Sequence, residues 1–354
     1  MDNAGTKLRW KGITGLAAIA ALLVFVGTLP AEAQDQPKPK KKIGFSLKLS
    51  GGFGYLLDGA GDINNFRQGQ KDALSALSAD EGYAATFDWP RPWFLPDFTA
   101  DIIINVGSHF GFGFGSGYIL GSSRGRYAVN YQASGTFWGS NYVVDSKLDY
   151  RPDYQLRAVP LKFGLYLFQP LGKARKFTFF AHAGAGYYLG RAKFDRRFQS
   201  TSKSTEDYGY GTSSSSLDSQ FDITESAKCN AWGYQGGLGL ECKLSRALAL
   251  GAEVCGRAVN FKSWEGDLLW TGKETYEYES PYWSYEHNDT ENEKWHGSLW
   301  TYQIRDDEAN KSYTYMMLLE KQPNDGYYKN VRKSALNLNA LSLALSIKVH
   351  FDLF

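Results

Sequence analysis

The chain has 354 residues, a net charge of +2 and 43% hydrophobic residues, which excludes an intrinsically disordered or strongly acidic protein. The balance of 39 Lys and Arg against 37 Asp and Glu gives no electrostatic reason to expect a nucleic-acid partner. Glycine and aromatic residues are both abundant, with 38 Gly, 23 Tyr, 22 Phe and 10 Trp. The mean hydropathy of -0.39 does not exclude a membrane β-barrel, because such a protein needs apolar residues on only one face of each strand.

The N-terminal residues have the order of a secretory signal peptide. Lys7, Arg9 and Lys11 precede an apolar run over residues 13–26, and Ala31-Glu32-Ala33 follows as a small-residue cleavage site. The apolar run is shorter than the roughly 20 residues of a spanning helix. We therefore predict a signal peptide over 1–33, a Pro- and Lys-rich tether over 34–42 and a structured chain over 43–354.

Alternation of apolar and polar residues then predicts strands along the rest of the chain. The last segment is the clearest: apolar residues occupy every odd position from Leu341 to Leu353, with mostly polar or small residues between them. In another segment, Phe110, Phe112 and Phe114 alternate with glycines. The predicted strands cover 43–55, 99–106, 110–120, 159–167, 177–189, 232–244, 248–258 and 341–353.

The connections between these strands alternate between short and long. Short turns follow the second, fourth and sixth strands, whereas the other connections cover 56–97, 121–153, 190–230 and 262–339. This layout predicts an all-β fold, an antiparallel transmembrane up-and-down barrel of eight strands with long extracellular loops. We expect an amphipathic helix capped by Asp62 in the first loop and a flexible, solvated stretch over Ser213–Ser216 in the third.

The fourth loop leaves the number of strands open. Its segments 275–279 and 300–304 also alternate, and they either prolong the sheet above the membrane as a hairpin or raise the number of strands to ten or more. A soluble sandwich or lipocalin-like barrel would alternate as well, but its second face would meet water and carry few glycines.

The contents of the polar phase predict the interior of the barrel. This phase holds most of the strand glycines together with charges of both signs, which favours a narrow lumen in which the charges pair. We therefore expect a lumen plugged by an ion-pair network rather than an open pore. The predicted network residues are Lys48, Asp101, Lys162, Glu241, Lys243, Glu253, Arg257, Lys348 and Asp352.

Together, the signal-like N-terminus, the alternating strands, the Gly-x-Gly-x-Gly strand and the terminal Phe354 resemble the small eight-stranded outer-membrane barrels of the outer-membrane-protein-A and opacity-protein class. The resemblance covers 43–354 and implies a bacterial outer-membrane location, lipid contact, and recognition of the C-terminal strand by the barrel-assembly machinery. Phe354 departs from the class because it falls one residue out of phase with Phe351 and Leu353.

The functional expectations follow from these features. Asp289, Glu291 and Glu293 form a possible weak cation site, although neighbouring acids in a loop are more often simply solvated. The pattern contains no catalytic motif, so we expect a non-enzymatic protein without a cofactor or a resident metal. We expect a structural or surface-interaction role, with an extracellular ligand bound by the loops. A porin-like barrel or a transporter of small apolar solutes is the alternative.

Overall fold

The structure is a computed structural model that describes residues 43–91, 94–137, 139–172, 175–306, 311–324 and 326–352. Within these ranges the chain forms one helix and fifteen strands, so the predicted all-β class is confirmed. The predicted signal peptide and tether, and the terminal Phe354, lie outside the described residues. No helix in the described ranges has the length and apolar character needed to cross a membrane.

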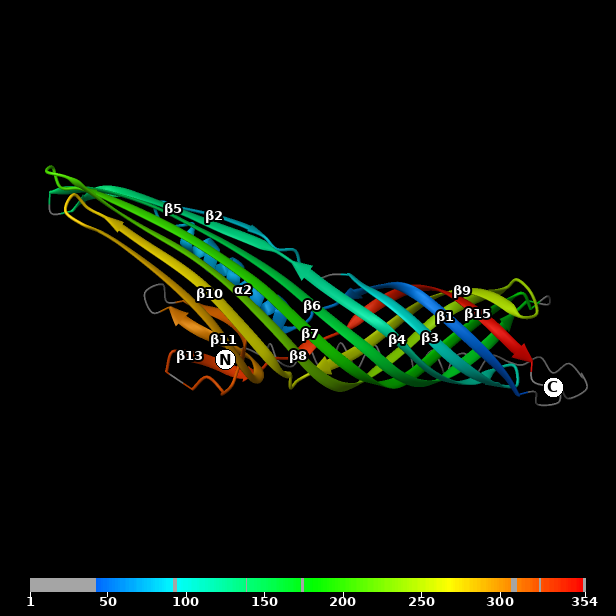
Figure 1. The fold of residues 1–354 in the computed structure, drawn as a ribbon. Helices are drawn as coiled ribbons and strands as arrows, with labels where there is room; N and C mark the ends of the chain where they lie inside the picture. The colour runs from blue at the N-terminus through cyan, green and yellow to red at the C-terminus, as the bar shows by residue number, and fades with distance from the viewer. Residues whose placement is uncertain are drawn as a thin grey trace, which may run out of the picture.

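Eight of the strands pair antiparallel in a closed ring (Figure 1). Each strand segment predicted from alternation overlaps one strand of this ring, and the pairing of the first strand with the last closes it. In hydrogen-bonded order, the ring strands are β1 (Ile43–Leu56), β3 (Phe94–Val106), β4 (Phe110–Arg124), β6 (Ser140–Leu171), β7 (Phe177–Asp207), β8 (Thr212–Lys243), β9 (Leu248–Phe261) and β15 (Ala340–Asp352).

The ring has an inside-out distribution of residue types. Its apolar phase faces outward: Phe53 and Leu345 are 63% and 69% exposed. Its polar phase faces the lumen, where Lys48 and Lys348 are only 1% and 2% exposed. In a barrel that folds in water, the apolar phase would be the buried one. The outer wall of this ring therefore suits an apolar environment.

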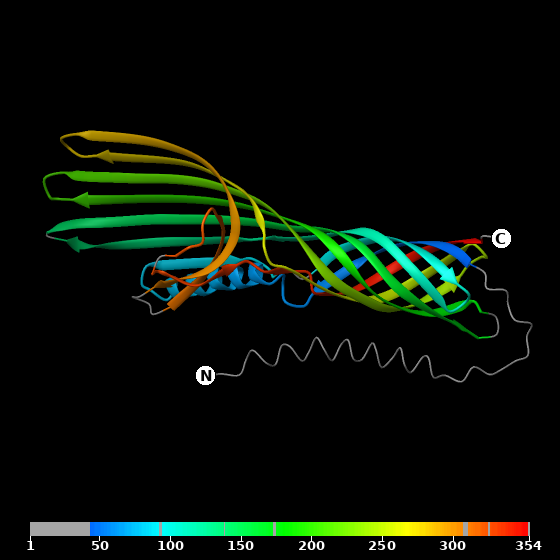
Figure 2. The ribbon, with the colours of Figure 1, turned by 90° about the horizontal axis from the view of Figure 1, so that it is seen from below.

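The ring strands β6, β7 and β8 continue far beyond the ring and form a projection (Figure 2). β8 pairs with β9 only from Gly233 to Lys243, and the rest of the strand, from Thr212, belongs to the projection. At about 3.3 Å per residue, this part of β8 is roughly 70 Å long. The prediction of long loops over 121–153 and 190–230 is therefore wrong, and so is the prediction of a flexible stretch over Ser213–Ser216. These residues lie mostly in paired strands.

Shorter strands complete the sheet of the projection. The β10–β11 hairpin pairs with β8 above its contact with β9, so it prolongs the sheet and does not enter the ring. β2 pairs with β5, which pairs with β6, and β12 and β13 both pair with β11. These strands are β2 (Tyr83–Asp88), β5 (Arg126–Phe137), β10 (Glu265–Glu279), β11 (Ser284–Asp306), β12 (Lys311–Leu319) and β13 (Tyr328–Lys333). The two-residue β14 (Leu336–Asn337) pairs with β9.

The predicted helix forms as α2 (Asp62–Leu77) and packs against β12 and β2 in the projection. It buries Ile63, Phe66 and Leu74, the apolar side of an amphipathic helix. The predicted cap is wrong: Gly61 is the N-cap residue and makes no side-chain cap. The Asp62 carboxylate instead contacts Arg332 and accepts a hydrogen bond from the Ala335 N–H at 2.7 Å, which joins the helix start to the chain after β13.

The main hydrophobic core fills the base of the projection, directly above the lumen of the ring. Trp89 is 3% exposed there, stacks on Tyr154 with the ring centroids 5.2 Å apart, and donates its indole N–H to Ser123 Oγ at 3.0 Å. Trp89 begins the sequence Trp89-Pro90-Arg91-Pro92-Trp93, of which Pro92 and Trp93 lie outside the described residues. Trp89 itself belongs to the buried core.

A buried ion pair connects the edge strand β12 to the middle of this sheet. Arg196 on β7 and Glu225 on β8 contact each other, and both are buried in the core. Arg196 also donates to the Met316 carbonyl at 2.8 Å, while Glu225 accepts from the Leu318 N–H at 2.6 Å. Burial raises the pKa of the Glu225 carboxyl, against the opposing effect of Arg196. Because both side chains are buried, the face of β7 and β8 that carries Arg196 and Glu225 is the face that packs against the core.

Candidate functional site

The lumen of the ring holds three buried Lys–carboxylate pairs from the predicted network. Each member occupies an inward-facing strand position, and the two residues of each pair lie on ring strands separated by one other strand. The pairs are Lys48 Nζ with Glu253 Oε2 at 2.7 Å, Lys162 Nζ with Asp101 Oδ1 at 2.9 Å and Lys348 Nζ with Glu241 Oε1 at 3.1 Å. All six side chains are less than 10% exposed. Because an unpaired charge at such depth costs several kcal/mol, roughly, each charged group in the packed lumen depends on its partner.

A fourth lumen pair contains a residue that the sequence analysis missed. The Arg257 guanidinium donates to Asp97 Oδ2 at 2.7 Å, and both side chains are largely buried. Asp97 precedes the predicted strand at 99–106, but it shares the phase of Asp101, so extending that strand by one alternation would have included it. His182 also faces the lumen, with its Nε2 3.5 Å from Glu253 Oε2.

Two members of the predicted network do not belong to this buried set. Lys243 is exposed because it is the last residue of β8, where the lumen opens to the turn side of the ring. Asp352 ends β15, and its side chain lies outside the described part of the chain. The prediction for Lys243 fails because alternation fixes the direction of a side chain but not its depth along the barrel axis.

Glycines and aromatic rings fill much of the remaining lumen. A Cβ atom on Gly115 would overlap the Asp101 carboxylate, and one on Gly113 would overlap the Tyr166 ring. Between the ion pairs lies a cavity of about 40 Å³, lined among others by Lys162, Tyr166 and Glu253. A space of this size holds about one or two water molecules. Charged residues and rings therefore occupy most of this cross-section of the ring.

The predicted cation site takes a different form. Asp289, Glu291 and Glu293 occupy alternate positions of β11, so their side chains share one face of the strand, spaced roughly 7 Å apart. No group of three or more His, Cys, Asp or Glu side chains in the described ranges can hold a metal ion. The three carboxylates form an acidic row along the strand rather than a converging ligand set.

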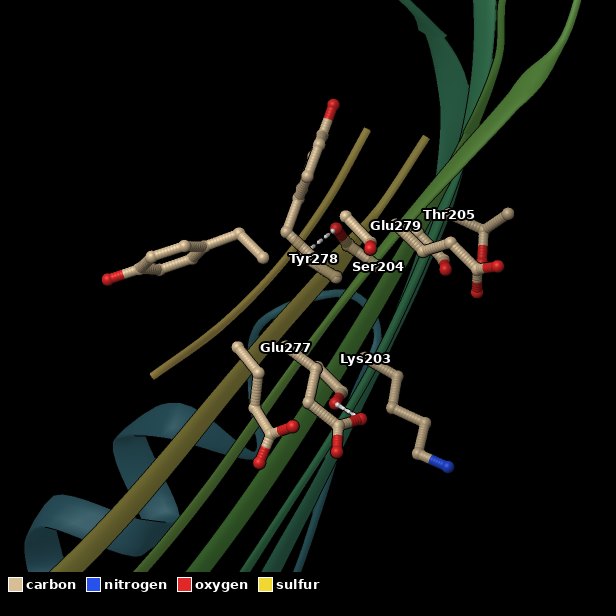
Figure 3. A pocket seen from close by; sticks show the side chains of 12 residues that line it. Lys203, Ser204, Thr205, Glu277, Tyr278 and Glu279 are labelled. Atoms are coloured by element: carbon tan, nitrogen blue, oxygen red, sulfur yellow. Dashed lines mark hydrogen bonds between the residues drawn. The ribbon is translucent and has the colours of Figure 1, made fainter. Parts of the chain in front are cut away.

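A hollow of about 460 Å³ lies near the tip of the projection, where the ends of β7, β8, β10 and β11 lie side by side (Figure 3). Tyr278 and Glu277 are neighbours on β10 and point to opposite sides of the sheet, with Lys203 on the side of Glu277. Ser204 Oγ and Ser215 Oγ are 2.9 Å apart and form a hydrogen bond on the Tyr278 side. The two faces of the projection thus differ in chemistry.

On the convex face, away from the core, charges of opposite sign pair in solvent. Asp149 on β6 accepts hydrogen bonds from both Arg151 and Arg126, each with a guanidinium nitrogen 2.8 Å from its Oδ2. The hydrogen bond from Arg151 is the main cause that lowers the pKa of this carboxyl, and Arg126 adds to it. Because these groups are exposed, such pairs add little stability.

Comparisons with known proteins add little to this geometry. No family model and no curated protein matches the sequence. Among solved structures, the chain is similar to the outer membrane protein OprG from Pseudomonas aeruginosa, with 11% identity, coverage of 88% of this chain and 98% of that chain, and a TM-score of 0.33. The ferric citrate transporter FecA in the unliganded form aligns with 9% identity, coverage of 89% and 80%, and a TM-score of 0.11. Likenesses this weak are no basis for assigning a function.

Proposed function

We propose that this chain is a non-enzymatic outer-membrane barrel whose eight ring strands cross the membrane and whose projection presents an interaction surface outside the cell. The observation that carries the proposal is the inside-out ring, with apolar side chains exposed around its wall and ion pairs buried in its lumen. This arrangement agrees with the small-barrel class that the sequence resembles. The apolar wall also favours contact with membrane lipid, and the resemblance implies insertion by the barrel-assembly machinery through β15.

The packed lumen supports a structural or surface role over conduction. A porin keeps a water-filled channel along its axis, whereas this lumen holds four buried ion pairs with a cavity of only about 40 Å³ between them. A hollow of about 570 Å³ opens at the turn end of the ring, and the buried pair of Glu241 and Lys348 lies along its lining. The charged lumen residues contact one another, so they serve the packing of the barrel. The projection then carries the function, because it is the part of the chain that extends beyond the ring.

The orientation can be tested with two matched cysteine variants. Ser280 caps the β10–β11 turn by accepting the Trp283 N–H, and Ser245 caps the β8–β9 turn by accepting the Leu248 N–H in the same way. We expect a membrane-impermeant maleimide to label Ser280→Cys on intact cells and to label Ser245→Cys only after the outer membrane is permeabilised. Wild type, with its three free cysteines, gives the background.

The result can also contradict the proposal. Equal labelling of both variants on intact cells, or recovery of the folded protein in the soluble periplasmic fraction, would exclude this orientation. Gel mobility before and after boiling provides the folding control, because folded barrels of this class migrate differently from the unfolded chain.

A further inference from the structure

The projection has a concave face that continues outward from the buried core. Its orientation follows from register: Ser204 pairs with Ser215, Ser215 with Tyr278, and Tyr278 with Tyr285, so all four side chains share one face. Ser215 lies an even number of residues from the core residue Glu225 on β8, which places this face on the core side. We call it the distal concave face. It comprises the core-side positions of β5 129–135, β6 142–148, β7 200–206, β8 213–219, β10 272–278 and β11 285–293.

The distal concave face carries charge of one sign. Five carboxylates lie on it, and none of its positions within these described segments is a Lys or Arg. The carboxylates are Glu206, Glu274, Asp289, Glu291 and Glu293. The lysines of the same strands, Lys203, Lys273 and Lys294, fall in the opposite phase and lie on the convex face. This separation gives the concave face a negative potential that attracts cations.

Aromatic rings lie beside the carboxylates on this face. Tyr276 and Tyr285 have ring centroids 6.3 Å apart, and Tyr278 lies 4.7 Å from Trp283 of the adjoining turn. Tyr285 is 48% exposed and Trp283 is 59% exposed. Exposed rings of this kind attract Lys and Arg side chains through their negative faces. Rings and carboxylates thus favour the same class of ligand.

The spacing of the carboxylates favours an extended polypeptide over a small cation as the ligand of this face. Asp289, Glu291 and Glu293 repeat every two residues, and an extended polypeptide presents alternate side chains on one face at the same interval, roughly 7 Å. A metal ion needs converging ligands, which this row does not provide. Serine hydroxyls on β7 and β8 line the neighbouring strands and can serve the backbone of such a chain.

We propose that the distal concave face binds an extended cationic polypeptide segment rich in Lys or Arg. The natural partner would reach this face from outside the cell, so the proposal rests on the proposed function. Binding to the purified protein, however, is independent of cellular location, so the two proposals can fail separately.

The test measures binding of a fluorescent oligoarginine peptide to the full chain purified in detergent, by anisotropy at low and high salt. One variant neutralises the concave carboxylates: Glu274→Gln, Asp289→Asn, Glu291→Gln and Glu293→Gln. The matched control removes four convex carboxylates: Glu277→Gln, Glu279→Gln, Glu286→Gln and Asp218→Asn. Both variants change the net charge equally, and the gel mobility of unboiled samples checks that each is folded.

We expect the wild-type protein to bind the peptide with an affinity that falls as salt rises. The concave variant should bind about tenfold more weakly, as expected for four exposed charge contacts, and the convex variant should stay within about twofold of wild type. Tyr285→Ala should also weaken binding. Absence of wild-type binding, or equal loss in both charge variants, would overturn the proposal. So would tighter binding of a neutral polysaccharide that depends on Tyr285 but not on the carboxylates.

Discussion

The buried pair of Lys48 and Glu253 gives the sharpest prediction about how the ring is stabilised. Their charged atoms are 2.7 Å apart, and the side chains are 1% and 8% exposed. The Lys48 ammonium also lies 4.4 Å from the centre of the Phe180 ring. The variant Glu253→Gln keeps the shape of the side chain but leaves a buried lysine without its carboxylate. We expect it to lower the free energy of unfolding by about 3–5 kcal/mol.

The other two variants complete a double-mutant cycle. Lys48→Met leaves Glu253 with His182 as a neighbour at 3.5 Å, so we expect a smaller loss, about 2–3 kcal/mol. The double variant contains no unpaired buried charge from this pair and should be about as stable as the better single variant. The coupling between the two sites should therefore be about 3–5 kcal/mol, the full loss of the worse single variant.

Urea unfolding in lipid vesicles, followed by tryptophan fluorescence and gel mobility, measures these free energies. The exposed pair of Arg124 and Asp153, 2.7 Å apart with the arginine 77% exposed, is the control: Asp153→Asn should cost less than about 1 kcal/mol. Additive effects of Lys48→Met and Glu253→Gln, within about 0.5 kcal/mol, would refute the reasoning that the lumen is stabilised by charge pairing.

Three further predictions follow from local geometry. Gly115→Ala should cost about 1–3 kcal/mol of unfolding free energy because its methyl group would displace the Asp101 carboxylate. Gly44→Ala is the control and should cost less, because the nearest atom to its methyl group would be 3.6 Å away. Equal costs of the two variants in urea unfolding would count against a tightly packed lumen. Trp89→Ala should lower the free energy of unfolding by about 3–5 kcal/mol in the same assay because it removes a large buried ring. A loss below roughly 1 kcal/mol would show that the core of the projection does not unfold together with the ring. Because the pKa of Asp149 is lowered in the folded protein, its ionised carboxylate adds a small stability at pH values above the ordinary carboxyl pKa, and this stability is lost as the pH falls through the folded-state pKa. If NMR gave Asp149 a pKa at or above the ordinary carboxyl value, that result would contradict the hydrogen bonds from its two arginines.

The ring could be predicted from sequence because each ring strand has one apolar face and one polar or small face. Phe112 and Phe114 face outward while Gly113 faces the lumen, and this contrast identifies both the strand and its orientation. The ion pairs follow from the same phase, since inward-facing charges in a narrow lumen have few alternatives to pairing.

The projection could not be predicted in the same way because neither face of its outer sheet is strongly apolar. Ser213–Ser216 contain no hydrophobic residue, so the stretch resembles a solvated loop. In the structure all four residues pair with β7, and residues 214–216 also pair with β10. In the sequence, the acidic row of β11 is visible only as three clustered acids. Only the strand assignment shows that they lie on one face together with Tyr285.

Planar-bilayer recording on purified, refolded protein tests the plugged lumen most directly, because paired charges and packed rings should leave no continuous channel through the ring. Wild-type protein with the gel mobility of the folded form should insert without producing discrete conductance steps, while a porin recorded in the same membrane gives them. Reproducible steps from the wild-type protein would contradict the plugged lumen and favour the transport alternative.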